Sequence, residues 1–243
     1  MQMSLNLGHG EGRIAELRER LRATFGRQTS GPDRLDPVSQ LVRSILGSRT
    51  KDAVSWAAFM RLASGYPEWT MLAGAGAGVV APLIEEVSYV EKKAREIPLA
   101  LWQIQRDRGA LSLDFLAEHG VEAATAWLCG LTGVRPKVAA SVLNFSRLNM
   151  RAFVVDPHVH RVARRLGLIG WGCDSSKAHE LLLDAMPDAW APDDLLEMHW
   201  LMKILGQQAC SHAEPRCHIC PLAQDCPKRG VEGAAVLAFR PKA

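Results

Sequence analysis

Four cysteines near the C-terminal end of the 243-residue chain could hold a metal centre. They follow the spacing C-x6-C-x2-C-x5-C in a segment dense in turn-forming residues, and are Cys210, Cys217, Cys220 and Cys226. Because the N-terminus lacks the layout of a secretory signal, we expect a cytosolic chain with reduced thiols. Zinc ribbons use two separated C-x2-C pairs, whereas this segment has one. The spacing therefore favours a 4Fe-4S cluster over zinc.

Such a cluster is expected to be structural. Protein sulfur would ligate all four irons, which leaves no open coordination position for a substrate. The cluster would then fix a loop that Arg216, His218 and Lys228 make basic. A zinc-stabilised interaction module stays open as an alternative, and catalytic chemistry must be sought elsewhere in the chain.

Basic side chains gather in the segment 135–165. It contains seven of them and one acid, Asp156, although the net charge of the whole chain is only +3. A solvated helix face explains such a band equally well. Beside a phosphate-binding motif, however, a basic band favours nucleic acid as the partner.

The sequence LTGVRPKVAASVL at 131–143 predicts such a motif, a tight glycine turn that enters a helix. Pro136 suits the first position of that helix, where its missing N–H costs nothing. Backbone N–H groups of the turn, with the positive end of the helix, can hold one phosphate without reading sequence. A plain helix–helix turn is the alternative.

We expect helices to carry these groups. Apolar residues recur with helical period almost throughout, and the 48% hydrophobic and 23% charged composition is that of an ordinary globular chain. Only Phe153–Val155 resembles a strand, so we predict an all-α protein with no membrane-spanning stretch and a loose tail after about Lys228. Pro98 is expected to kink or divide the helix around it, and Thr50 or Asp52 to cap the helix that contains Trp56.

Three motifs in order resemble the endonuclease III branch of the helix-hairpin-helix DNA glycosylases. They are LTGVRPKVAASVLNF, AFVVDPHVHRVARRLGLI and the cysteine signature, and the resemblance spans roughly Asp36 to Cys226. It implies a two-lobed all-α fold, with one lobe at 36–148 and an iron-sulfur lobe made of 1–35 and 149–243. Double-stranded DNA would lie between the lobes, with the damaged nucleotide rotated out of the duplex.

The resemblance also implies roles for two residues. Lys137 matches the amine nucleophile and Asp156 matches the acid–base carboxylate of the family's V-D-x-H motif. An amine with a pKa of about 10.4 is mostly protonated at neutral pH, so Lys137 needs burial or cationic neighbours, for which Arg135 and Arg161 are candidates. The alternatives are a phosphate contact for Lys137 and a helix N-cap for Asp156, and a cap could coexist with catalysis.

Several positions depart from the family pattern. Arg135 replaces the second glycine of G-V-G, beside Gly133 and Val134, and would be strained unless its φ is negative. Arg49 replaces the glutamine that fills the space left by the flipped base, and arginine can contact a guanine edge with two hydrogen bonds. Tyr89 stands in the wedge segment and could stack there. His158 matches the family histidine, although the residue before it is proline.

The leading hypothesis is a glycosylase with abasic-site lyase activity on oxidised or otherwise damaged pyrimidines, acting as a monomer and associated with the nucleoid if bacterial. One alternative is a monofunctional glycosylase in which Asp156 activates water. Another is a protein that binds damaged DNA, or abasic sites, with little turnover.

Overall fold

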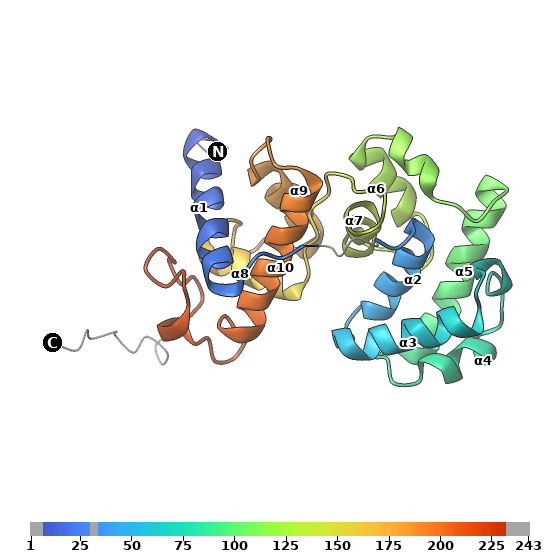
Figure 1. Cartoon of the computed structure of the whole chain (residues 1–243). Coiled ribbons are helices and arrows are strands. Elements are labelled where there is room, and N and C mark those ends of the chain that lie inside the picture. The colour runs from blue at the N-terminus through green and yellow to red at the C-terminus, as the bar shows by residue number, and fades with distance from the viewer. Residues whose placement is uncertain (1–6, 30–33, 232–243) are drawn as a thin grey trace. The chain divides into compact units, whose positions relative to one another are not determined.

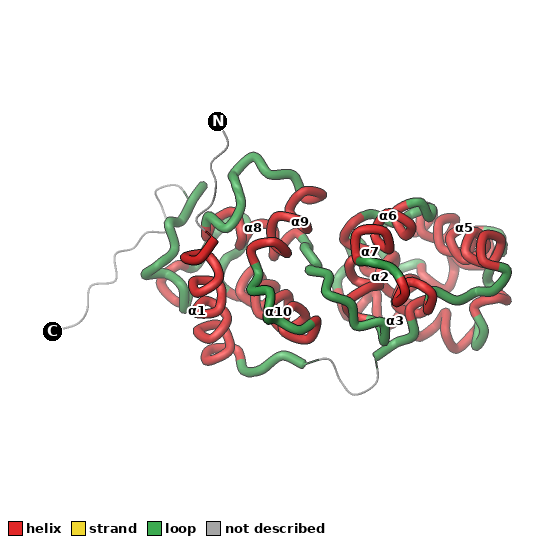
Figure 2. Tube along the Cα trace, turned by 90° about the horizontal axis from the view of Figure 1, so that it is seen from above, coloured by secondary structure: helices red, strands yellow, loops and turns green. Residues whose placement is uncertain are grey.

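The computed structural model describes residues 7–29 and 34–231, and within these ranges the chain is helical with no strand (Figures 1 and 2), which confirms the all-α prediction. The α-helices are α1 (Leu7–Phe25), α2 (Pro37–Gly47), α3 (Asp52–Gly65), α4 (Ala77–Val80), α5 (Val90–Arg108), α6 (Val121–Cys129), α7 (Pro136–Phe145), α8 (Pro157–Leu166), α9 (Ser175–Ala185) and α10 (Pro192–Gln208). Short 3-10 helices are η1 (Trp69–Met71), η2 (Ala81–Ile84), η3 (Asp114–Glu118) and η4 (Cys217–Ile219).

The chain divides into two compact units. The central unit is Gly31–Ala152 and contains α2 to α7, while the terminal unit joins Met1–Ser30 to Phe153–Ala243 and contains α1 and α8 to α10 (Figure 1). The lobes predicted from the sequence have their boundaries at 35/36 and 148/149, a few residues from these.

In the central unit, α2 and α3 begin in different ways. The Asp36 carboxylate caps α2 by accepting from the N–H groups of Val38 and Ser39, both at 3.0 Å. The N-cap of α3 is Lys51, which makes no side-chain cap bond, so the cap predicted at Thr50 or Asp52 is wrong. The hydroxyl of Thr50 is engaged elsewhere, since it accepts from the ammonium of Lys93 at 2.8 Å.

Pro98 lies inside α5, and the helix continues through it, so of the two predicted effects, a kink or a division of the helix, the division is wrong. Pro98 is buried together with Ile97 and Leu101 on the face of α5 that packs against the core. Burial of that apolar face stabilises the helix by more than the one backbone hydrogen bond that proline removes.

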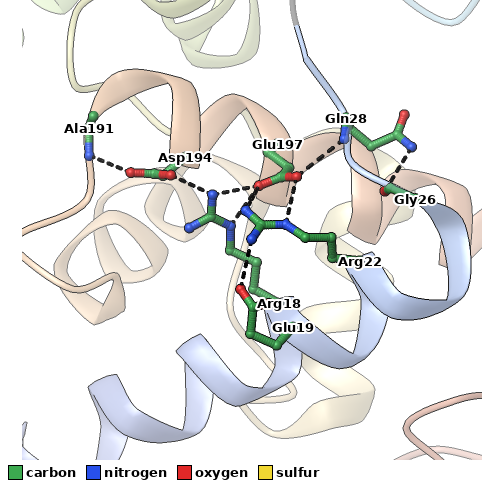
Figure 3. A network of polar contacts seen from close by, with 8 residues as sticks. All are labelled: Arg18, Glu19, Arg22, Gly26, Gln28, Ala191, Asp194 and Glu197. Atoms are coloured by element: carbon green, nitrogen blue, oxygen red, sulfur yellow. Dashed lines mark hydrogen bonds and ion pairs between the residues drawn. The ribbon is translucent and has the colours of Figure 1, made fainter.

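In the terminal unit, α1 and α10 are joined by a buried ionic network (Figure 3). Glu197, which is 2% exposed, accepts from Arg18 Nε at 2.8 Å, from Arg22 Nε at 3.0 Å and from the backbone N–H of Gln28 at 3.2 Å. Arg18 also contacts Asp194, near the start of α10. The N-terminal helix is therefore attached to α10 through two carboxylates and two guanidinium groups, beside the apolar contacts of Ile14, Leu17 and Leu21.

Replacing Glu197 with glutamine is expected to lower the free energy of unfolding by about 3 kcal/mol, because the buried guanidinium of Arg18 and the partly buried guanidinium of Arg22 lose this counter-charge. Burial alone raises the pKa of Glu197, but hydrogen bonds from Arg22 and Arg18 outweigh it and hold that pKa below the ordinary 4.5. The stabilisation is therefore present above pH 4.5 and is lost as the pH falls through the lowered pKa. Denaturation of the unaltered protein and of Glu197→Gln across this pH range should show that the difference between their free energies of unfolding becomes smaller as the pH falls.

Glu19→Gln is the matched control, since Glu19 pairs with Arg22 at 3.0 Å while its side chain is 62% exposed. It should change stability by less than about 0.5 kcal/mol. An equal loss in both variants would contradict the role given to Glu197.

No helix in the described ranges is both long and apolar enough to cross a membrane. A loose tail is predicted after about Lys228. Its residues from 232 onward lie outside the ranges that the structure describes.

Candidate functional site

The turn between α6 and α7 has the glycine geometry that the sequence predicts. Gly133 has φ +79°, and a Cβ there would lie 2.9 Å from the Cβ of Glu96 on α5. Both the left-handed backbone and the close approach of α5 therefore require glycine. The turn is fastened to α5 a second time, because the N–H of Thr132 donates to Gln103 Oε1 at 2.8 Å. Val134 is 6% exposed and anchors the turn to the core.

Arg135 does not strain this turn. Its φ is −125° with an extended ψ of 169°, which any residue adopts, and it occupies the N-cap position of α7. Pro136 follows at the first helical position, as predicted. The Arg135 side chain is exposed, so replacing the glycine adds a cation beside the turn without distorting its backbone.

Lys137 is the second residue of α7, directly after the turn, and its side chain is half-buried. The Ser141 hydroxyl donates to its main-chain oxygen at 2.8 Å, which fixes the first turn of the helix. Lys137 is close enough to Lys93 for its charge to lower the pKa of that residue. Coulomb repulsion is mutual, so the structure supplies Lys137 with a cationic neighbour that the sequence had not indicated.

Arg49 and Tyr89 are brought together. Arg49 Nη1 donates to the Tyr89 hydroxyl at 3.0 Å, and the guanidinium lies 5.6 Å from the ring centroid. Both residues have a left-handed backbone, with φ values of 55° and 61°. Such a conformation costs a residue with a side chain about 1 kcal/mol or more. Tyr89 is nevertheless 57% exposed, and Arg49 is exposed as well. An arginine and an aromatic ring therefore lie together at the surface, each on a loop with a strained backbone.

Asp156 caps α8, and the cap predicted as its alternative role is confirmed. The N–H groups of His158 and Val159 both donate to Oδ1, each at 2.8 Å, so neither cap bond uses Oδ2. The extended segment before it is buried, and Val154 O accepts from His199 Nδ1 at 2.8 Å. Residues 153–155, which resemble a strand in sequence, therefore form a buried extended segment that ends at the cap of α8. They have no sheet partner in the described chain.

The environment of Asp156 keeps it ionised although it is only 5% exposed. Burial raises the pKa of Asp156, but the charges of His199 and Lys203, the hydrogen bond from the Val159 N–H and the charge of His158 together lower it below the ordinary 3.8. Lys203 is itself buried in α10, with its ammonium 4.7 Å from the centroid of the Trp200 ring. A buried carboxylate among cations can accept a proton or stabilise a positive charge.

His158 is half-buried and held by Arg161. The two side chains are 3.1 Å apart at Nδ1 and Nη2, and Arg161 also donates to the carbonyls of Gly206 and Cys210, both at 2.8 Å. A Cβ on Gly206 would lie 2.8 Å from the Cβ of His158, so that glycine lets α10 approach α8. Arg161 thus fastens the start of α8 to the end of α10 within the terminal unit.

The four cysteines of the signature form one group of thiols. Burial raises the pKa of Cys220 to about 11, and the charges of Cys210, Cys226 and Cys217 act in the same direction. Donors point at two of the sulfurs, with Arg165 Nη1 3.3 Å from Cys210 Sγ and the Lys228 N–H 3.4 Å from Cys226 Sγ. These features fit a thiolate-bound metal group, whose positive charge would favour the deprotonated sulfurs.

Within the described ranges no three histidine, cysteine or acidic side chains form a group that could hold a single metal ion. A cubane of four irons and four sulfides is larger than one ion and spaces its ligands more widely, so this finding about single ions does not test a cluster.

A family model for the HhH-GPD superfamily of base excision DNA repair proteins matches residues 42–188. That range is more than half of the chain and includes the glycine turn, Lys137 and Asp156. The chain belongs to the HhH-GPD superfamily.

Relatives of this HhH-GPD protein confirm the resemblance to the endonuclease III branch. Endonuclease III-like protein 1 of Gallus gallus is 28% identical over 200 residues, which cover 82% of this chain and 66% of that protein. A solved structure of a trapped covalent endonuclease III–DNA intermediate aligns with a TM-score of 0.72 at 22% identity, over 89% of this chain and 95% of that one. A thermostable thymine-DNA glycosylase aligns at 0.71 and 15%, over 89% and 96%. At these identities the solved structures establish the HhH-GPD fold alone.

The predicted site residues are divided between the two units of this HhH-GPD chain. The central unit contains Arg49, Tyr89, Gly133, Val134, Arg135 and Lys137, and the terminal unit contains Asp156, His158 and the four cysteines. Sequence reasoning missed Lys93 and Lys203, two buried lysines beside Lys137 and Asp156. A signal existed for Lys93, because the helical period of α5 places it on the same buried face as Ile97 and Leu101.

Proposed function

We propose that the protein is a base excision repair DNA glycosylase with abasic-site lyase activity, acting as a monomer on damaged pyrimidines in double-stranded DNA. The observation that carries the proposal is the half-buried residue Lys137, placed directly after the glycine turn of an HhH-GPD chain. The name of one solved neighbour supports it, since that structure is a trapped covalent intermediate of endonuclease III with DNA.

Lys137 is proposed as the nucleophile. Its neutral amine attacks C1′ of the flipped nucleotide, and the bond from C1′ to the base breaks with its electron pair leaving on the base, which accepts a proton. The sugar then opens to an imine between C1′ and the Lys137 nitrogen. Removal of a C2′ proton expels the 3′ phosphate by β-elimination, and water hydrolyses the imine to restore the amine. Lys93, whose pKa the charge of Lys137 lowers, is the cationic neighbour nearest in effect to this amine.

Asp156 is proposed as the carboxylate that assists this attack. Its Oδ2, which the α8 cap does not use, accepts the proton that the attacking amine loses. Its negative charge also stabilises the cationic character that builds on the sugar while the base departs. The lowered pKa of Asp156 keeps the group ionised and ready for both tasks at neutral pH.

DNA contacts are assigned to the remaining candidates. The turn at Gly133 and Val134, with the N-terminus of α7 and the exposed Arg135, holds a phosphate. Tyr89 and Arg49 enter the space that the flipped nucleotide leaves, and His158 contacts the strand near Asp156. Because a guanidinium can donate two hydrogen bonds to guanine, Arg49 favours guanine opposite the lesion.

The group of Cys210, Cys217, Cys220 and Cys226 is proposed to hold a 4Fe-4S cluster, which is typical of the endonuclease III family. When bound, the cluster supplies a rigid cross-link for the loop and no chemistry at the sugar. The Arg165 guanidinium, which donates to the carbonyls of Ser211 and His212 as well as to the Cys210 sulfur, holds the loop in the form that presents these ligands.

Replacing Cys220 with serine is expected to remove most of the iron, from about four atoms per chain to less than one, because a serine hydroxyl is a poor ligand for this cluster. Iron analysis and the visible absorbance of the purified protein measure the loss. Cys173→Ser is the control, since Cys173 lies outside the group, and it should retain full iron. Zinc in place of iron in the unaltered protein would contradict the cluster.

The proposed function is tested by incubating the protein with duplexes that carry single damaged pyrimidines, with and without borohydride. Base release together with a trapped protein–DNA adduct is the expected result, because borohydride reduces the imine to a stable amine. Base release without an adduct would replace the proposal by attack of water activated by Asp156. If the protein binds tightly but releases no base from any of the lesions, it is a damage-binding protein and the proposal is wrong.

A further inference from the structure

Lys93 is a buried lysine whose ammonium donates three hydrogen bonds, all to the short segment 46–50. It is 3% exposed, and its ammonium donates to the carbonyls of Leu46 and Ser48, both at 2.7 Å, and to the hydroxyl of Thr50 at 2.8 Å. Burial and then the charge of Lys137 lower the pKa of Lys93 to about 8, so the group is still mostly protonated at pH 7. A buried cation with three oxygen partners is costly to place, which points to a specific task.

The first effect of these bonds is on the loop that carries Arg49. The carbonyl of Leu46 belongs to the last turn of α2 and that of Ser48 directly precedes Arg49, whereas the hydroxyl of Thr50 directly follows it. The ammonium therefore binds the chain on both sides of Arg49. Its contacts offset the cost of the left-handed conformation, φ 55°, that Arg49 adopts between them.

Lys93 lies in the first turn of α5, which carries Tyr89 at its N-cap. The main-chain N–H of Lys93 donates to the carbonyl of Tyr89 at 3.1 Å as the first helical bond, so the side chain connects this turn to the Arg49 loop. The Thr50 hydroxyl, besides accepting from Lys93, accepts from the N–H of Ser88 at 3.1 Å. One side chain and one hydroxyl thus connect the end of α2 to the start of α5, both in the central unit (Figure 1).

We propose that Lys93 is a positioning residue, which holds the Arg49 loop and the Tyr89 loop so that this pair meets the DNA opposite the damaged nucleotide. The inference builds on the proposed function, because it takes Arg49 and Tyr89 as DNA contacts. A lysine suits this task because its ammonium has three N–H donors, one for each of the three oxygens. The pair is then preorganised on the free protein, so ordering these loops takes little of the free energy of DNA binding.

Lys93→Met keeps the length of the side chain and removes its charge and donors. We expect faster hydrogen–deuterium exchange at 48–50 and 88–89 in the free protein, since the side-chain bonds that connect the Arg49 loop to the first turn of α5 are lost. We also expect the preference for guanine over adenine opposite the lesion to fall by about threefold or more, against about tenfold for Arg49→Ala. A ratio of two rates measured on one protein cancels any effect on the Lys137 amine.

Two further variants keep the test sharp. Lys92→Met is the matched control. The Lys92 side chain is 60% exposed, and the substitution removes the same charge from the preceding position of α5. Thr50→Val removes only the shared hydroxyl and serves if Lys93→Met fails to fold; it should show the same two changes at smaller size. In Arg49→Ala/Lys93→Met the preference should equal that of Arg49→Ala alone, since Lys93 acts through Arg49.

Unchanged exchange at both loops, or an unchanged preference in Lys93→Met where Arg49→Ala loses it, overturns the inference. If Arg49→Ala has the same preference as the unaltered protein, the proposed role of Arg49 fails. Lys93 is then judged on the exchange of the two loops alone, so the failure of one proposal is not read as the failure of the other.

Discussion

Replacing Lys137 with alanine should abolish the borohydride-trapped adduct and lower strand cleavage at abasic sites by roughly a thousandfold or more. The adduct is a reduced imine between C1′ and the lysine nitrogen, so it cannot form without that amine. The fold should be retained, because the side chain is half-buried and Ser141 binds the main-chain oxygen of residue 137. Trapping on denaturing gels and cleavage rates measure the loss, and thermal unfolding checks the fold.

Lys92→Ala is the control for this experiment, since it removes an exposed lysine of the same unit and should trap DNA as the unaltered protein does. Undiminished trapping in Lys137→Ala would assign the covalent chemistry to another amine. Lost trapping with base release unchanged would show that Lys137 serves the lyase step only and that water displaces the base.

Features set by neighbouring residues could be predicted from the sequence. Pro136 at the first position of α7 and Asp156 at the cap of α8 follow from local backbone chemistry, which no distant contact alters. The same holds for the left-handed glycine in the hairpin turn, because a tight entry into a helix needs it. These local rules located Lys137 and Asp156 within their elements.

Features set by distant contacts could not be predicted in this way. Thr50 has the side chain of a helix cap, yet Lys93, 43 residues further on, takes its hydroxyl. Pro98 breaks a helix by local rules, but the apolar face of α5 carries the helix through it. The left-handed conformation of Arg49 depends on contacts from another helix. Tertiary contacts override local preference at each of these positions.

Replacing Asp156 with asparagine should lower the rate of base release by roughly a hundredfold to ten-thousandfold, the usual worth of a positioned acid–base group. Asparagine caps a helix about as well as aspartate, so its amide oxygen can still accept from the N–H groups of His158 and Val159. The variant removes the charge that faces His199 and Lys203, and a modest loss of stability is therefore also expected. Single-turnover base release at a temperature well below unfolding separates the two effects.

Asp36→Asn is a matched control, because Asp36 also precedes a proline and caps α2 through two backbone N–H groups. It should leave base release within about threefold, as expected for a cap that keeps its acceptor. Equal losses in both variants would mean that a weakened cap, and not a missing carboxylate, slows the reaction. The pH profile adds an independent check, since the lowered pKa of Asp156 keeps it ionised above its ordinary 3.8 and the acid limb of base release must lie below that pH. An acid limb near pH 6 that survives in Asp156→Asn would belong to a different group.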